Sequence, residues 1–170
     1  VYTKKFILDA ETALDEEVLK QVFGTVRYTY NKTLGIVNDD TWQSRRAELD
    51  LTELKYLKYQ TVNGNSLMVV NNPWLEDTYY DLRYYAMKEL HTNLVVNRKK
   101  RKDGTIKTYN LKHRQKKSSS ESIYCRRRWI KPTDDKRHID VHLGKNLQVR
   151  FKMPPGFNID EINHDIMIQR

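Results

Sequence analysis

IDVHLGKNLQVRF, residues 139–151, alternates apolar and polar residues on both sides of a short Gly-Lys-Asn segment. Apolar side chains occupy positions 139, 141 and 143 and then 147, 149 and 151. This period of two gives each half one apolar face, and a glycine-containing turn between two such runs predicts a β-hairpin. The Pro-Pro-Gly sequence at 154–156 is expected to end the second strand.

Four other stretches have the pattern of strands. Residues 1–8 and 165–170 are rich in aromatic and aliphatic side chains. Residues 109–116 and 122–128 each place apolar side chains at alternate positions. We expect these last two stretches to pair, with the serine run at 118–120 as the turn between them.

Between the first strand and the later ones, the apolar period is helical. Thr12 and Asp15 have the spacing of an N-cap pair, and apolar residues from Leu19 to Val37 recur every three or four positions. This pattern predicts the strongest helix of the chain. Gly24 is unfavourable inside a helix, and the close approach of another backbone or of a ligand would explain it.

Two further helices are expected. The first covers residues 41–60, and the second begins at Pro73 and carries an apolar stripe through Leu94. The second helix runs into RKKRK, residues 98–102, where positive charge suits the C-terminal end of the helix dipole. An Asp-Gly turn at 103–104 then returns the chain.

The order of elements is strand, helices and then several strands. It predicts an α+β fold in which helices are inserted into a small β-sheet or β-barrel. The 170 residues contain no run of about 18 apolar residues and no N-terminal signal peptide, so we expect a soluble intracellular protein without a membrane partner. Because the chain begins with Val1 and ends at Arg170 directly after an apolar alternation, we also expect it to be a segment of a longer protein.

Positive charge is concentrated in one section of the sequence. The chain has a net charge of +9, whereas residues 98–131 alone hold fourteen lysines and arginines against two acidic residues, a net of +12. This asymmetry favours a polyanionic partner, and nucleic acid above all. The RKKRK run is compatible with phosphate contacts, with helix-dipole complementarity and with a nuclear localisation signal.

On two paired strands, every second side chain lies on the same face. One face would then be basic and follow a phosphate backbone, with Tyr124 or Trp129 available to stack a base. The alternative is that these residues form ordinary solvated strand faces. The predicted basic face consists of Lys112, Arg114, Lys116, Tyr124, Arg126 and Arg128.

Candidate catalytic groups are few. His138 and His142 would share a strand face without a nearby third ligand, so surface histidines are expected. Cys125 is the only cysteine, which excludes an internal disulfide and a thiolate zinc cluster, and its alternation with Ile123 predicts a buried, unreactive thiol. The four tyrosines between 79 and 85 are better explained by packing and by base or sugar contacts than as recombinase nucleophiles. No carboxylate trio with the arrangement of a two-metal nuclease emerges.

Two motifs resemble those of a known family. VRYTYNKTL, residues 26–34, resembles the R-x-x-Y-N-x-x-L helix near the start of TnpB proteins, which are transposon-encoded RNA-guided nucleases. LKHRQKKSSSESI, residues 111–123, resembles the F-K-x-R-S-K-K-x-x-x-x-S-I strand pair of Fanzor proteins, their eukaryotic and giant-virus relatives. The other matching elements, in order, are a helix with Pro73, Arg83, Ala86 and Asn93 and the hairpin LGKNLQVRFKMP at 143–154.

The resemblance implies a fold and a partner. Residues 1–10 and 105–170 would form an OB-like β-barrel wedge domain, and residues 11–104 a helical recognition domain, which together hold guide RNA and target-adjacent DNA. A RuvC-type nuclease domain with Mg²⁺ and a zinc-binding insert with Zn²⁺ would lie outside this sequence, so no cofactor is expected within it. The protein would be nuclear if it is a eukaryotic Fanzor.

These arguments give one set of expected nucleic-acid-binding residues. The helix motif supplies four, the basic strand motif another four, and the charge pattern the rest. His113 and the triple arginine at 126–128 depart from the family pattern. The alternatives are a freestanding basic RNA- or DNA-binding protein without a nuclease and, more weakly, a tyrosine recombinase. The full set is Arg27, Tyr28, Tyr30, Asn31, Arg98, Lys99, Lys100, Arg101, Lys112, Arg114, Lys116, Lys117, Tyr124, Arg126, Arg128 and Trp129.

Overall fold

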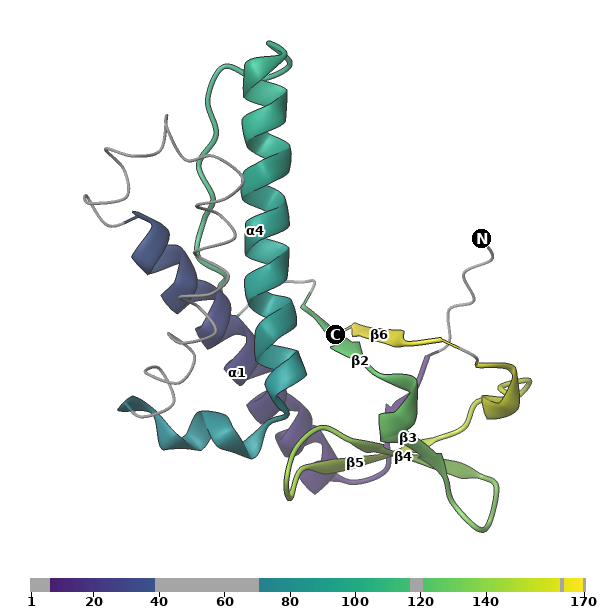
Figure 1. Ribbon diagram of the computed structural model, residues 1–170. Coiled ribbons are helices and arrows are strands. Elements are labelled where there is room, and N and C mark those ends of the chain that lie inside the picture. The colour runs from purple at the N-terminus through teal and green to yellow at the C-terminus, as the bar shows by residue number, and fades with distance from the viewer. Residues whose placement is uncertain (1–6, 39–70, 117–120, 163, 170) are drawn as a thin grey trace.

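The computed structural model describes residues 7–38, 71–116, 121–162 and 164–169, and Figure 1 shows the arrangement of its elements. Long helices lie against small antiparallel sheets, which confirms the α+β class. The helices are α1 (Ala13–Asn38) and α4 (Tyr80–Lys102), with 3-10 helices η1 (Pro73–Asp77), η2 (Arg127–Trp129) and η3 (Ile159–Glu161). The strands are β1 (Asp9–Ala10), β2 (Ser122–Cys125), β3 (Ile130–Pro132), β4 (His138–His142), β5 (Gln148–Lys152) and β6 (Ile166–Gln169).

The predicted hairpin is confirmed as β4 and β5. Val141 lies opposite Val149 and Ile139 opposite Phe151, and all four side chains are buried. They form the inner face that the period of two indicated. β1 pairs with the outer edge of β5 and β3 with that of β4, which gives a four-stranded sheet in the order β1-β5-β4-β3.

A second sheet consists of β2 and β6. Ile123 lies opposite Ile168 and Cys125 opposite Ile166, so the C-terminal strand predicted at 165–170 is confirmed. Among the described residues the two sheets are open and separate, and their strands do not close into a barrel. The described β-structure therefore consists of two antiparallel sheets.

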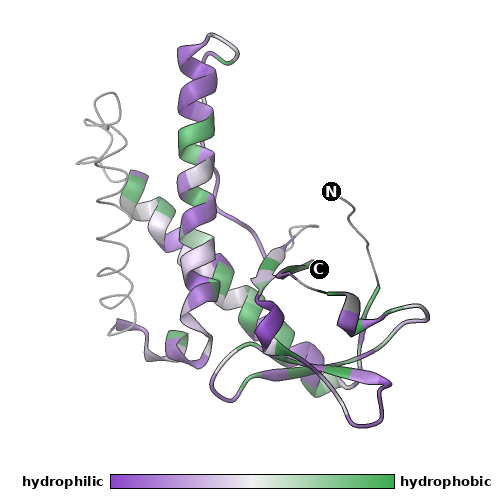
Figure 2. Ribbon diagram, turned by 45° about the vertical axis from the view of Figure 1, so that its right-hand side comes forward, coloured by the Kyte–Doolittle hydropathy of each residue, from purple (hydrophilic) through white to green (hydrophobic). Residues whose placement is uncertain are grey.

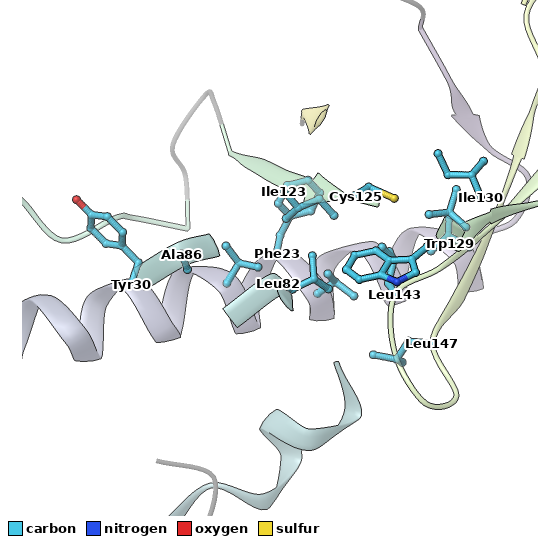
Figure 3. Packing of buried hydrophobic residues seen from close by; sticks show 14 of the residues in the cluster. Phe23, Tyr30, Leu82, Ala86, Ile123, Cys125, Trp129, Ile130, Leu143 and Leu147 are labelled. Atoms are coloured by element: carbon cyan, nitrogen blue, oxygen red, sulfur yellow. The ribbon is translucent and has the colours of Figure 1, made fainter. Parts of the chain in front are cut away.

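The N-terminal helix begins as predicted. Asp15 donates its backbone N–H to the Thr12 hydroxyl (3.2 Å), and the Asp15 carboxylate accepts the backbone N–H of Thr12 (3.1 Å). The apolar face of α1 packs into a core shared with α4 and both sheets. Figure 3 shows Phe23 of α1, Leu82 of α4 and Ile123 of β2 within this core. Because one core joins the helices to the sheets, α1 is held firmly in place.

The prediction that Pro73 begins a long α-helix is wrong. Pro73 begins the short helix η1, and α4 begins only at Tyr80. Between them, Thr78 forms a β-bridge with Gly144, and Tyr79 N donates to Leu143 O (3.0 Å). These bonds hold the chain extended just before α4. The predicted apolar stripe is buried along α4 at Leu82, Ala86, Leu90 and Leu94.

The prediction of a strand at 109–116 is also wrong. This segment returns from the end of α4 alongside that helix (Figure 1). Its backbone bonds to a side chain instead of to a strand: Arg114 N donates to Asn31 Oδ1 (2.8 Å), and Arg114 O accepts from Asn31 Nδ2 (3.0 Å). β2, its predicted partner, pairs with β6. The paired basic strand face is therefore absent from the described part of the chain.

Two predicted elements fall wholly or largely outside the described residues. The helix at 41–60 lies outside them, as do positions 1–6 of the strand predicted at 1–8. The first described strand, β1, covers only Asp9–Ala10. It pairs with Phe151 and Lys152 of β5, and it follows directly after the predicted strand, whose two described residues, 7 and 8, are not in a strand.

Figure 2 shows how hydropathy is distributed over the fold. The end of α4 that extends away from the sheets is hydrophilic, whereas apolar residues gather where α1, α4 and the sheets meet. None of the helices in the described ranges is long and apolar enough to cross a membrane.

Candidate nucleic-acid interface

The C-terminal end of α4 and the segment that follows it carry solvent-exposed cations. Asp103 N donates to Lys99 O (3.0 Å) and Ile106 N to Lys100 O (3.1 Å), which closes the helix and turns the chain back. Gly104 has a φ of 79°, a left-handed conformation that favours glycine. Within the described ranges, no carboxylate lies within ion-pairing distance of these cations. We call them the basic surface: Lys99, Lys100, Arg101, Lys102, Lys107, Lys112 and Lys116.

Two other predicted residues of this section are not part of the basic surface. Arg98, near the C-terminal end of α4, is half-buried, and Lys117 lies outside the described residues. The basic surface therefore retains five of the predicted residues and adds Lys102 and Lys107.

Residues 105–116, which run back alongside α4, are called the return segment. Arg114 links this segment to both helices. Besides the bonds between its backbone and Asn31, its guanidinium lies over the ring of Tyr30, 4.0 Å from the centroid, and forms an ion pair with Glu89 of α4. Tyr30 is only 4% exposed, so its ring packs within the protein and presents little surface to a ligand. Arg114 and Asn31 position the lysines on either side of them.

Arg27, also predicted to bind nucleic acid, forms a buried ion pair with Glu121. The exposed fractions of the two side chains are 17% and 7%. Most of the positive charge of Arg27 is therefore offset within the protein. The pair fixes the start of β2 against α1, and this interaction was not visible in the sequence pattern.

The arginines that follow β2 are also largely used within the protein. Arg126 Nε donates to Asp81 (2.6 Å), and Arg127 donates to three backbone carbonyls. Arg128 is 74% exposed, with Asp81 at 3.8 Å. Of the three, Arg128 therefore presents the most accessible positive charge.

Trp129 and Tyr124, the two aromatic residues predicted to stack a base, make contacts within the protein. Trp129 is 6% exposed and packs on Tyr79, with ring centroids 4.9 Å apart, so the prediction that its indole is available is wrong. Tyr124 packs on Tyr85 (4.0 Å) and donates its hydroxyl to Asp165 (2.9 Å). This hydrogen bond raises the pKa of Tyr124 to about 12. Trp129 is the last residue of η2, and its side chain lies in the core that joins the helices to the sheets.

A groove on α1 brings several predicted residues together with others that were not predicted. Its volume is about 600 Å³. Tyr28 lies in its wall, with its hydroxyl donating to Asn72 (3.0 Å) and its ring edge-to-face with Trp74 (5.1 Å). Trp74 is 42% exposed. We call this cavity the α1 groove, and its described lining consists of Gln21, Gly24, Arg27, Tyr28, Asn31, Lys32, Trp74 and His113.

Part of this groove was accessible to sequence reasoning. Gly24, Tyr28 and Lys32 are four residues apart, and Arg27 and Asn31 share the same helical face. Trp74 was missed, because it lies in a segment without periodicity and only the fold brings it to Tyr28. Of the two explanations expected for Gly24, a close backbone is not found in the described part of the chain, where a Cβ atom at this position would meet only the guanidinium of Arg27, at 3.8 Å.

The cysteine, the two histidines and the tyrosines that were considered as catalytic candidates are buried or contact other side chains. Cys125 is fully buried as predicted, and burial raises the pKa of its thiol to about 12. His138 Nδ1 lies 2.8 Å from Asp135, and His142 is half-buried on the same strand. Tyr80 and Tyr84 stack on α4 with centroids 6.1 Å apart. In the described ranges, no group of three or more His, Cys, Asp or Glu side chains is placed to hold a metal ion.

No protein-family model matches this chain, and no curated protein matches its sequence.

Proposed function

We propose that this chain is the nucleic-acid-binding part of an RNA-guided DNA endonuclease of the TnpB and Fanzor type, and that it holds guide RNA and target-adjacent DNA. The basic surface carries this proposal. Its exposed cations have no carboxylate partner among the described residues, and they follow one end of α4 and the segment beside it. Such cations bind phosphates with a gain in entropy from released counterions.

The finer fold assignment belongs to the same proposal. Residues 1–10 and 105–170 would form a wedge domain with an OB-like barrel, and residues 11–104 a recognition domain. The element order supports it, because α1 and α4 lie between β1 and β2 in the sequence. In addition, β1 of the four-stranded sheet and β6 of the second sheet line one cavity of about 550 Å³, together with residues of α1.

Binding and cleavage would be divided between parts of the protein. Under this proposal, DNA cleavage requires Mg²⁺ in a RuvC-type domain and Zn²⁺ in its insert, both outside this sequence. The protein would be intracellular, and the RKKRK run at 98–102 would serve nuclear import in a eukaryotic host. The chain itself would supply affinity for RNA and DNA.

The test measures the dissociation constant for one structured RNA at several salt concentrations. Lys107, Lys112 and Lys116 are changed together to Ala. Loss of three phosphate contacts should weaken binding and flatten the slope of log K against log salt by about 2 to 3. The matched control changes Lys131, Lys145 and Lys152, three exposed lysines on the four-stranded sheet and its hairpin loop, to Ala. Equal effects of the two triple variants would refute the role of the basic surface.

A second measurement separates the guided nuclease from a freestanding nucleic-acid-binding protein, which would use the same surface. RNA that copurifies with the longer protein is sequenced. A single defined non-coding RNA supports the guided system, and a mixture of cellular RNAs supports the freestanding protein.

A further inference from the structure

Gly24 is a residue whose position in the fold does not explain its presence. In a helix interior, glycine is less favourable than alanine by about 0.8–1 kcal/mol. Gly24 lies in the first half of α1, and among the described residues the only atom near its missing Cβ is Arg27 Nη2, at the ordinary contact distance of 3.8 Å. Neither backbone geometry nor packing requires glycine here. Its absent side chain does, however, leave the α1 groove open.

The wall of the groove is aromatic and accessible. Trp74 is 42% exposed, although large apolar side chains are usually covered in a stable fold. Tyr28 is fixed by Asn72 and by its edge-to-face contact with Trp74. One aromatic ring thus supports another whose surface remains open to solvent. This is the arrangement of a stacking platform.

The charges of the groove lie at its rim. Arg27, in the lining, is offset by Glu121, whereas Lys32 and His113 are exposed and have no carboxylate within ion-pairing distance in the described ranges. The ammonium of Lys32 lies 5.8 Å from the ring centroid of Tyr28. A ligand with a flat apolar part and an anionic part would therefore place its ring on Trp74 and its anion toward Lys32.

The groove borders the basic surface. His113 lines the groove and directly follows Lys112 of the basic surface in the sequence. Lys116, three residues later, lies beside α1: the pKa of Glu17 is lowered chiefly by its hydrogen bond to Lys20 and, to a smaller extent, by Lys116. An RNA strand bound along the basic surface could therefore extend directly into the α1 groove.

We propose that the α1 groove binds a single unpaired RNA nucleotide, with its base stacked on Trp74 and its phosphate near Lys32. The inference rests on the proposed function, since the basic surface must first hold the RNA. RNA is favoured over duplex DNA because folded RNAs have bulges and loops whose unstacked bases stack on aromatic side chains. The volume of about 600 Å³ lies within the range of about 300–1,000 Å³ common for ligand pockets.

The experiment compares two RNA duplexes of equal length, one perfect and one with a single-nucleotide bulge that carries 2-aminopurine. The wild-type chain should bind the bulged duplex about 5- to 100-fold more tightly, which is the usual range for one stacked base. Stacking on the indole should also quench the 2-aminopurine fluorescence. Trp74→Ala should remove the quenching and bring the affinity ratio close to one.

A second variant fills the groove without changing charge. Gly24→Met places a side chain in the cavity and should also abolish the preference for the bulge. Gly35→Met makes the same change on the same helix, at an exposed position outside the described lining and with nothing within 4 Å of its Cβ, and should retain the preference. Circular dichroism checks that both variants remain folded.

The outcomes separate this inference from the proposed function. If the wild-type chain binds both duplexes equally, or if Trp74→Ala and Gly24→Met keep the preference, the groove does not bind a base, whereas salt-dependent RNA binding still stands. The triple alanine variant at Lys107, Lys112 and Lys116 should weaken binding of both duplexes. If the wild-type chain binds neither duplex, both proposals fail.

Discussion

Arg27 and Glu121 are 94 positions apart in the sequence and form an ion pair that is largely shielded from water. Moving two charges out of water is unfavourable, and their mutual attraction offsets this only while both partners are present. The pair joins α1 to the start of β2. Its residues therefore support the fold, although the sequence led us to expect that Arg27 contacts nucleic acid.

Arg27→Met should destabilise the chain by about 3–5 kcal/mol, because it leaves the Glu121 carboxylate buried without a partner. The double variant Arg27→Met with Glu121→Met should recover most of that loss, since apolar residues often replace a buried pair at little cost. Urea unfolding of both single variants and the double variant gives the coupling free energy. A coupling free energy near zero would show that the pair does not form in solution.

The arginines and lysines of the basic section have different structural roles. Arg114, Arg126 and Arg127 each bond to carboxylates or backbone carbonyls, whereas the lysines of the basic surface form no ion pair with any described carboxylate. A guanidinium presents five donors in a fixed plane and satisfies several acceptors at once, but an ammonium is strongly hydrated. The charge count from the sequence therefore indicated the section in which the exposed cations lie, but it did not distinguish them from the arginines that bond within the protein.

At the scale of elements, the junction between η1 and α4 is held by the hairpin loop. Lys145 N donates to Asp77 O (3.0 Å) and Tyr79 N to Leu143 O (3.0 Å), on either side of the bridge between Thr78 and Gly144. Arg83 donates to the carbonyl oxygens of Leu75 and Thr78. The start of α4, and with it the placement of Trp74, depends on this contact.

Gly144→Ala should disrupt this contact. A Cβ atom at this position would lie 1.8 Å from Asp77 O, so the backbone must move, and we expect a loss of about 2–3 kcal/mol. Hydrogen exchange should accelerate at the amides of Tyr79, directly before α4, and of Lys145, in the hairpin loop, before the amides of α4 itself are affected. Gly156→Ala is the control for backbone strain. Gly156 has a φ of 76°, but no described atom lies within 4 Å of a Cβ there, so this variant is strained without a clash. Unchanged exchange at both amides would contradict the proposed contact.

The elements that sequence reasoning located correctly are those set by local periodicity. The hairpin follows from its period of two, and the cap of α1 from the spacing of Thr12 and Asp15. The strand predicted at 109–116 failed although its alternation is equally clear. The backbone groups of Arg114 that would bond to a neighbouring strand bond instead to the side chain of Asn31, and a contact across 83 positions leaves no local signal.

At the scale of the whole molecule, charge and packing occupy different regions. The core joins α1, α4 and the sheets, while the end of α4 that extends away from the sheets is hydrophilic (Figure 2). The basic surface begins at this end of α4 and continues along the segment that follows it. Like charges that lie close together repel each other and favour the unfolded chain, in which they are further apart. The basic surface should therefore weaken stability when no polyanion is bound.

The triple alanine variant at Lys107, Lys112 and Lys116 should consequently be more stable than the wild-type chain at low ionic strength, by about 0.5–1 kcal/mol. The difference should shrink at about 0.15 M salt, where the screening length falls to about 8 Å. Urea unfolding at both salt concentrations measures it, with the Lys131, Lys145 and Lys152 variant as the control of equal charge change. A loss of more than about 1 kcal/mol at low salt would mean that the three lysines support the fold, and their effect on RNA binding could then be attributed to unfolding. A gain separates stability from binding, because the same substitutions would strengthen the free protein while weakening its complex with RNA.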